Sequence, residues 1–310
     1  MKKQFDVLTI GDLCVDLIVT GKAVVPEFGQ KEKLVEDYAL EMGGSCSIFA
    51  CQTAKLGFKT AVIGKVGQDA FGELIVNTLK QSGVSTDYII TTPHLKTGLT
   101  VILNRITDRA ILTYNGTIDS VGIEDIPDGL LQSVRHFHIG SYFLMKHIQP
   151  HYPDLIKKLK QYGATVSLDT NWDPEERWDS GLWDILPFVD VFLPNENEAL
   201  AITRELDLDR AIKKLKEIIP VVVVKKGKAG AVVYTGHDRY AVPSLEVQMV
   251  DAVGAGDSYD GGFVYGFVSG KSLEECAKIG AICGSLNVTK PGGTRGQPVL
   301  EEVKLYTDLS

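Results

Sequence analysis

A short segment in the C-terminal half of the chain combines small residues with acids. In order, it consists of Asp251, Ala252, Val253, Gly254, Ala255, Gly256 and Asp257. Small residues leave backbone N–H groups open to a bulky anion. The apolar run 258–268 predicts a helix, whose N-terminus attracts negative charge. The pattern suits phosphoryl transfer, in which amides bind the transferred group and a carboxylate takes a proton from a hydroxyl. Spacing alone also allows a glycine-rich turn capped by Asp257.

The two aspartates and the small triplet between them resemble the C-terminal signature of the ribokinase-like carbohydrate kinases, of the fructokinase and ribokinase type. Similar motifs occur near residues 11–16, 43–45 and 195–198, so the resemblance covers nearly the whole chain. It implies a three-layer α/β/α sandwich with a mostly parallel central sheet and a small β-sheet lid. It also implies that Asp257 is the general base and that the amides of Gly254, Ala255 and Gly256 form an anion hole.

Two segments in the first 45 residues are predicted to bind the phosphoryl acceptor. Two aspartates follow the first apolar segment, and a Gly-Gly-Ser sequence precedes a helical pattern. Carboxylates accept hydrogen bonds from sugar hydroxyls, and glycines let a polyol approach backbone amides. The family resemblance implies the same role for both segments, and an arginine of the lid lies within reach. The predicted residues are Asp12, Asp16, Gly43, Gly44, Ser45 and Arg109.

The nucleotide and its metal ion are assigned to later segments. Asn195-x-x-Glu198 lies at a predicted strand-to-helix junction, where Glu198 would help to hold a hydrated Mg²⁺. Residues 225–230 supply glycines and positive charge that suit a nucleotide, although a basic hairpin is the alternative. The resemblance implies that both segments bind ATP and Mg²⁺, and that Asp251 and Val253 contribute to a K⁺ site. The residues assigned to ATP are Asn195, Lys225, Gly227 and Gly230.

Several positions depart from the family pattern. Cys14 and Ile48 stand where the family usually has Asn, and Lys225 stands where it has Thr or Ser. Asp173 replaces an Arg that is frequent in kinases of keto-deoxy sugar acids, so we expect it to repel a substrate carboxylate. Residues 43–49 contain no Lys or Arg to neutralise the phosphate of a phosphosugar.

These residues predict an ATP-dependent kinase of a fructose-like or ribose-like sugar. A nucleoside or phosphosugar kinase of the same fold is an alternative. A second alternative is a catalytically quiet sugar-sensing protein, because Cys14 and Ile48 stand where the family has two amide side chains that contact the sugar. Retention of Asp257 and of the complete small-residue triplet argues against the sensing protein.

Composition limits the class of protein. The chain has 310 residues, 44% of them apolar, which is enough for one large α/β domain with a small appendage. A net charge of -8 argues against nucleic acid and anionic membranes as partners. The five cysteines are odd in number and lack a Cys-x-x-Cys pair, so they predict buried reduced thiols in a cytoplasmic protein. His136 and His138 are expected to be packed and hydrogen-bonded rather than to bind a metal.

Predicted strands and helices must place these residues together. From residue 134 onward, strands and helices alternate as in a parallel sheet, and polar or glycine residues follow the strands. We expect a core of residues 1–12, 43–94 and 118–310, and a lid of residues 13–42 and 95–117. Exposed lid strands often pair with another chain, so a homodimer through the lid is a hypothesis. Core strands are predicted at 5–10, 60–66, 134–139, 165–168, 189–193, 221–224 and 231–234, and helices at 48–56, 70–82, 258–268 and 272–287.

Overall fold

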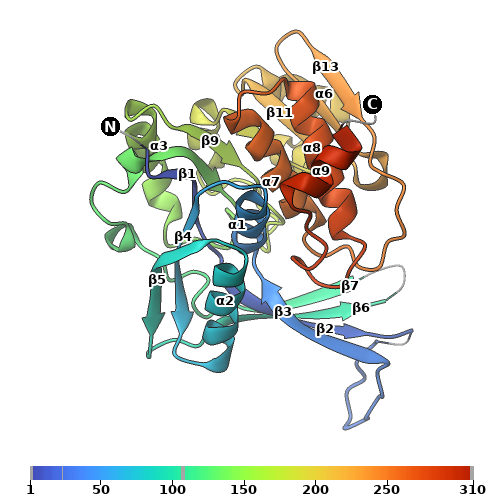
Figure 1. Ribbon diagram of the computed structural model, residues 1–310. Coiled ribbons are helices and arrows are strands. Elements are labelled where there is room, and N and C mark those ends of the chain that lie inside the picture. Colours follow the sequence, from blue (N-terminus) through green and yellow to red (C-terminus); the bar gives the residue numbers. More distant parts are fainter. Residues whose placement is uncertain (1–2, 23, 106–108, 308–310) are drawn as a thin grey trace.

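A nine-stranded sheet forms the centre of the protein, and the computed structural model describes residues 3–22, 24–105 and 109–307 of the chain (Figure 1). The strand order is β13-β12-β11-β10-β9-β8-β1-β4-β5. All neighbours pair in parallel except β11 with β12 and β12 with β13. The strands are β1 Phe5–Ile10, β4 Thr60–Gly67, β5 Ser85–Thr92, β8 Val134–Ile139, β9 Thr165–Leu168, β10 Val191–Phe192, β11 Val221–Lys225, β12 Ala231–Tyr234 and β13 Arg239–Val242.

Helices cover both faces of this sheet, which confirms the predicted three-layer α/β/α sandwich. Alternate residues of each strand point to opposite faces. Thus Leu8 of β1 belongs to the cluster that includes α3 to α6, whereas Val7 packs with Phe49 of α1 and Val264 of α7. The helices are α1 Ser45–Lys55, α2 Ala70–Gln81, α3 Tyr152–Gln161, α4 Leu182–Ile185, α5 Glu196–Thr203, α6 Leu208–Lys216, α7 Ala255–Val268, α8 Leu273–Asn287 and α9 Leu300–Thr307.

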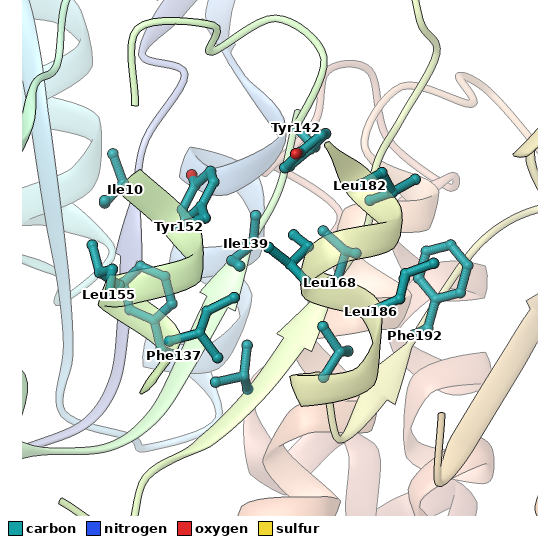
Figure 2. Packing of buried hydrophobic residues seen from close by; sticks show 14 of the residues in the cluster. Ile10, Phe137, Ile139, Tyr142, Tyr152, Leu155, Leu168, Leu182, Leu186 and Phe192 are labelled. Atoms are coloured by element: carbon teal, nitrogen blue, oxygen red, sulfur yellow. The ribbon is translucent and has the colours of Figure 1, made fainter. Parts of the chain in front are cut away.

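The largest hydrophobic cluster lies between the sheet and the helices α3 to α6. Figure 2 shows side chains of β8 and β9, such as Phe137 and Leu168, beside Leu155 of α3 and Leu186, which directly follows α4. These side chains are buried, and burying each apolar side chain of this size contributes about 1.5–3 kcal/mol. This core fixes the sheet, so the strand ends that carry polar residues have a rigid support.

A second, four-stranded sheet projects from the α/β body (Figure 1). Its order is β3-β2-β6-β7, and we call these four strands the lid. Residues 23 and 106–108, which fall within the predicted lid ranges, lie outside the described residues. The lid strands are β2 Cys14–Thr20, β3 Asp37–Gly43, β6 Gly98–Asn104 and β7 Arg109–Tyr114.

Most predicted elements are confirmed, with differences at their ends. Helix α7 begins at Ala255 rather than at residue 258, because Gly254 takes the left-handed conformation (φ 72°) and allows the helix to start there. Strand β10 is shorter than the predicted 189–193, since a 3-10 helix occupies Leu186–Phe188 just before it. Helix α8, predicted at 272–287, begins with a capping box, in which the Ser272 side chain accepts from the Glu275 amide and the Glu275 side chain accepts from the Ser272 amide.

Glycines let α7 lie close to its neighbours. A Cβ atom on Gly261 would lie 2.8 Å from Cβ of Gln52 in α1, and one on Gly262 would lie 2.8 Å from Sγ of Cys283 in α8. Real Cβ atoms do not approach so closely, so larger residues would push α7 away. The close packing therefore sets where the first turn of α7 meets the edge of the sheet.

Candidate active site

Polar residues collect where the parallel strands end. The chain leaves β1 toward β4 on one side and β8 toward β9 on the other, so β1 and β8 form the switch point at which open α/β sheets bind ligands. Asp12 follows β1 and Ser141 follows β8, and the Ser141 hydroxyl donates a hydrogen bond to Oδ2 of Asp12. This contact places Asp12, which is predicted to bind the phosphoryl acceptor, just beyond the carboxyl ends of β1 and β8.

Asp12 is tied to the first turn of α1. Its two carboxylate oxygens accept hydrogen bonds of 2.9 Å from the amides of Ser45 and Cys46. Burial raises the pKa of Asp12, while the bonds from Ser141 and the amides oppose that rise. The carboxylate thus fixes the helix that begins at Ser45, and it has little capacity left for a sugar hydroxyl.

Asp257 lies in the first turn of α7, close to Asp12, because Ser45 contacts both carboxylates. Its Oδ1 accepts a hydrogen bond from the hydroxyl of Ser45, a residue predicted to bind the sugar. Burial raises the pKa of Asp257 to about 7, and the nearby carboxylate of Asp169 adds to the shift, whereas Ser45 and Lys225 oppose it. A carboxylate poised near neutral pH and already bonded to a hydroxyl has the properties of a general base.

The amides of the small-residue triplet lie beside Asp257. Gly254 is the N-cap of α7, and Ala255 and Gly256 belong to its first turn, where amides have no acceptor within the helix. Ala255 N approaches the Ala252 carbonyl only at 3.5 Å, which is a weak contact. We refer to residues 254–257 as the anion loop.

The predicted acceptor residues of the lid face this crevice. Asp16 is in register with Glu41 and Thr100, and a Cβ on Gly43 would lie 2.2 Å from Oδ1 of Asp16. Gly43 therefore leaves the space that the carboxylate occupies. Burial raises the pKa of Asp16 to about 7, and the charge of Asp12 contributes to the rise. The exposed Arg109 lowers it, so this predicted residue acts on the same carboxylate.

Two positions that depart from the family pattern are accounted for by packing. A Cβ on Gly254 would lie 3.0 Å from Cγ2 of Ile48, and one on Gly293 would lie 2.4 Å from Cδ1 of Ile48. Ile48 thus packs beneath the anion loop instead of presenting an amide to the sugar. Cys14 places its thiol 3.8 Å from Oδ1 of Asp16, in the lid.

The expectation that Asp173 repels a substrate carboxylate is wrong. Asp173 is buried, and its carboxylate accepts hydrogen bonds of 2.8–2.9 Å from the amides of Glu175, Arg177 and Trp178. These bonds close the turn that follows residue 173, so the carboxylate serves its own loop. Acidity in the crevice comes from Asp12, Asp16 and Asp257 instead.

Lys225 sits at the end of β11 between two buried acids. Its ammonium group lies 2.7 Å from Oδ2 of Asp169 and 3.0 Å from Oδ2 of Asp260. We call these three residues the lysine triad. A Cβ on Gly256 would lie 3.5 Å from Nζ, so the ammonium group also borders the anion loop. Lys225, which is predicted to bind the nucleotide, thus has an ammonium group that two ion pairs hold in place.

Asn195 and Glu198 contact each other at the start of α5. The Glu198 carboxylate accepts from the backbone and side-chain N–H groups of Asn195, at 2.8 and 2.6 Å. Burial raises the pKa of Glu198 to about 7, and the charges of Asp169 and Asp257 add to the rise. In the described part of the chain, no three His, Cys, Asp or Glu side chains gather to hold a metal ion directly. The excess of carboxylates around Lys225 nevertheless fits a hydrated cation that the protein contacts through water.

The predicted K⁺ residues connect two loops. Asp251 accepts hydrogen bonds from the amides of Val253 at 3.0 Å and Gly292 at 2.9 Å. The carbonyl of Val253 accepts from the Asn287 side chain at 2.8 Å. These bonds hold residues 251–253, which precede the anion loop, against Asn287 and Gly292. Only the remaining lone pairs of these oxygens are left for a monovalent cation.

A cavity of about 880 Å³ opens beside the anion loop. Gly227 and Gly230 line it, as predicted for a nucleotide site, together with Gly256 and the ends of α7 and α8. Gly230 has a φ of 87°, and a Cβ there would lie 2.0 Å from the Val242 carbonyl, so no other residue fits. The cavity is lined by residues 244–249 on one side and by Gly256, the residue that precedes Asp257, on the other.

Two residues at the candidate site, Asp260 and Ser141, are not among the residues predicted from the sequence. Asp260 lies in an apolar helix one turn after Asp257, and an acid at such a position is itself a signal. Ser141 is one of several polar residues that follow a strand, and its contact with Asp12 requires the pairing of β1 with β8. His136 and His138 are buried and bonded to Thr165 and Ser167, which confirms the prediction of packed histidines.

Comparison with known proteins agrees with this geometry. The family described as pfkB family carbohydrate kinase matches residues 4–300. A ribokinase of Lactococcus lactis is 28% identical over 300 residues, 96% of this chain and 95% of that protein. Fructokinase-2 of Zea mays is 27% identical over 323 residues, 98% of this chain and 93% of that protein.

Solved structures share this fold. A putative ribokinase II from E. coli, in complex with ATP and Mg²⁺, has a TM-score of 0.85 and 25% identity, with 98% of this chain and 99% of that chain covered. An adenosine kinase from Sinorhizobium meliloti has a TM-score of 0.86 and 26% identity, with 99% and 100% covered. Within residues 3–22, 24–105 and 109–307, no helix has the length and apolar character needed to cross a membrane.

Proposed function

The chain belongs to the pfkB family of carbohydrate kinases, which transfer a phosphoryl group to a hydroxyl, and we propose that it phosphorylates a small neutral sugar of the ribose or fructose type with ATP. The observation that carries this proposal is the hydrogen bond between Asp257 and a hydroxyl, that of Ser45, beside the anion loop. A sugar hydroxyl at that position would be activated in the same way. The acidic crevice around Asp12 and Asp16 favours an uncharged acceptor.

The proposed mechanism assigns one role to each wall of the crevice. The nucleotide lies in the cavity with its terminal phosphate at the anion loop, whose amides stabilise the charge on the transferred group. The acceptor lies beneath the lid against Asp16 and the N-terminus of α1. Its hydroxyl takes the place of Ser45 at Asp257, or binds the second carboxylate oxygen, and Asp257 receives its proton.

Mg²⁺ would be held chiefly by phosphate oxygens and water, as is usual for this ion. Glu198 and Asn195 are the residues that would contact its waters, and the ion would neutralise charge on the phosphates. The surplus of acids near Lys225, namely the buried Asp169 and Glu198 and the half-buried Asp257, supports this assignment. K⁺ binding at Asp251 and Val253 stays a prediction, which initial rates measured in KCl and in NaCl check.

The five buried free thiols support a cytoplasmic location.

A panel of acceptors tests the function. Purified protein is incubated with ATP and Mg²⁺ plus ribose, fructose, nucleosides or fructose phosphates, and ADP formation and product mass are measured. We expect ADP formation that depends on ribose or fructose. Phosphorylation of a nucleoside instead would keep the chemistry and change the acceptor. Binding of sugar without any ADP formation would support the sensing protein and contradict the kinase.

The pH dependence follows from the raised pKa of Asp257. The base must be ionised, and burial raises its pKa to about 7, so activity should be lost as pH falls through about 7. We expect kcat/KM to fall about tenfold per pH unit below that value. The matched control is Asp16→Asn, because burial raises the pKa of Asp16 to about 7 as well. If kcat/KM of Asp16→Asn no longer falls as the pH drops below about 7, the titrating group is Asp16 and not Asp257.

We also propose that two copies associate through the outer face of the lid. The strand registers place Leu40, Leu17, Val101 and Leu112 in one row across the four strands, opposite to the row that contains Asp16. Leu112 is 64% exposed and Tyr38, two residues before Leu40 on the same face, is 70% exposed. An apolar sheet face of this kind is typical of a protein interface.

Sedimentation of the purified protein checks the association. We expect a dimer that Leu112→Lys converts to a monomer, because a buried unpaired charge opposes the contact. Leu206→Lys is the control, since Leu206 is fully exposed in the connection between α5 and α6. A wild-type monomer across the concentration range would remove the proposal.

A further inference from the structure

The hydroxyl of Ser45 occupies the position at which the proposed mechanism places the hydroxyl that accepts the phosphoryl group. Ser45 is the first residue of α1, and its Oγ donates a hydrogen bond to Oδ1 of Asp257. Asp257 is the proposed general base, and a serine hydroxyl beside a general base is a nucleophile. The chain therefore carries an alcohol of its own where the reaction is proposed to occur.

The backbone around Ser45 fixes this hydroxyl in place. The Ser45 amide donates a hydrogen bond of 2.9 Å to Oδ2 of Asp12. Gly44 has a φ of 87°, and a Cβ there would lie 2.3 Å from the carbonyl oxygen of Asp12, so the entry into α1 has little freedom to move. Ser45 itself is only 8% exposed. A hydroxyl that is already held at a base has little orientational freedom left to lose before it reacts.

The first turn of α1 also contacts the anion loop. Ile48 lies one turn after Ser45 on the same side of α1, and a Cβ on Gly254 would lie 3.0 Å from Cγ2 of Ile48. The start of α1 therefore packs against the start of α7, where the amides are proposed to hold the terminal phosphate of ATP. The lid contacts this loop in the same arrangement, since Ile102 packs with Val253. The hydroxyl, the base and the proposed phosphate site thus lie together.

Neighbouring serine hydroxyls have different surroundings. Ser141 donates its hydrogen bond to Asp12 and not to Asp257. Ser47 is fully buried two residues after Ser45, and within the part of the chain that the structure describes its hydroxyl has no hydrogen-bond partner. Ser45 is therefore the serine that Asp257 is placed to activate.

We propose that Ser45 is a self-phosphorylation site, which ATP modifies when no acceptor is bound. Oγ of Ser45 forms a bond to the terminal phosphorus of ATP, the bond from that phosphorus to the bridging oxygen breaks, the hydroxyl proton passes to Asp257, and ADP leaves. This inference rests on the proposed function, because it uses the same base and the same phosphoryl donor. The phosphoserine would add about two negative charges beside Asp12 and Asp257, so the modified chain should bind neither acceptor nor ATP productively.

Mass spectrometry of the intact protein tests the proposal. The wild type, Ser45→Ala, Ser47→Ala and Asp257→Asn are incubated with ATP and Mg²⁺ without sugar, and peptide fragmentation locates the modified residue. We expect the wild type and the matched control Ser47→Ala to gain one phosphoryl group per chain, at residue 45. Ser45→Ala should gain none. Asp257→Asn should gain it about 10²-fold more slowly or less, because the general base is lost.

Two further measurements keep the test decisive. Ser45→Thr retains a hydroxyl and should be modified at the same position, so it replaces Ser45→Ala if circular dichroism shows that the alanine variant does not fold. A sugar that binds as acceptor should slow the modification of the wild type as its concentration rises, because its hydroxyl competes for Asp257. A folded wild type that gains no phosphoryl group, gains it at another residue, or gains it as fast as Asp257→Asn does would overturn the proposal.

The outcomes also distinguish this inference from the function itself. If the wild type modifies Ser45 but phosphorylates none of the sugars, the proposed acceptor fails and the inference stands. If the wild type phosphorylates a sugar and Ser45 stays unmodified after long incubation with ATP alone, only the inference fails.

Discussion

Replacing Asp257 by Asn should reduce kcat about 10²- to 10⁴-fold, the range that a general base contributes. The amide keeps the shape of the carboxylate and can still accept from Ser45, but it cannot take a proton from the acceptor hydroxyl. Binding of ATP and sugar should be retained, because neither depends on proton transfer. Initial rates with both substrates saturating, together with calorimetric binding of each, measure the two effects.

Thermal stability provides the control for this variant. Burial raises the pKa of Asp257 to about 7 in the folded protein, so the ionised carboxylate is unfavourable at higher pH. Its destabilising effect is absent at low pH and develops as pH rises from the unfolded pKa to about 7. We therefore expect Asp257→Asn to be at least as stable as the wild type at pH 8. Normal turnover in a folded variant would exclude Asp257 as the base.

Replacing Gly254 by Ala should lower kcat about 10²-fold or more, as expected when an oxyanion donor is displaced. Gly254 has a φ of 72°, and its added Cβ would lie 2.8 Å from Cα and O of Gly293. The backbone cannot yield easily there, because Asp251 ties the same loop to Gly292. The amides of the first turn of α7 would therefore move away from the transferred group.

Gly270→Ala is the matched control for this change. Gly270 has a φ of 76°, but an added Cβ meets no heavy atom within 4 Å. Both variants carry the cost of a left-handed alanine, about 1 kcal/mol, and only Gly254→Ala adds the clash. Comparing the steady-state rates and melting temperatures of Gly254→Ala and Gly270→Ala separates the backbone strain of a left-handed alanine from displacement of the anion loop. Equal kcat values in the two variants would contradict the importance of the loop.

The sequence predicted the order of the layers and the positions of the anion loop and strand ends. These features depend on local patterns, namely alternating strands and helices and a glycine-rich helix start. The direction of side chains was harder to predict. Asp173 was expected to face the substrate, but three amides of its own turn bind it. Such turns depend on the conformation of a few loop residues, which composition does not determine.

Contacts between distant segments were also beyond the sequence. The lysine triad joins residues 169, 225 and 260, and it forms only because β9 and β11 flank β10 and α7 packs over them. The sequence places Lys225 in a basic loop, and nothing in that loop indicates its two acidic partners. The low exposure of Asp260 likewise depends on Gly261 and Gly262, which bring α7 close to α1 and α8.

The face of the lid that carries Asp16 packs against the loop that precedes α7. Ile18 and Ile102 pack against Val253, the residue before Gly254, and Glu41 of β3 forms an ion pair with Arg295. A displacement of the lid would therefore pull on the peptide that shapes the phosphate-binding amides. The position of the lid and the position of these amides are therefore coupled. If a bound sugar did not close the lid, the amides would not be placed to stabilise the transferred phosphoryl group, and ATP would not be hydrolysed by water.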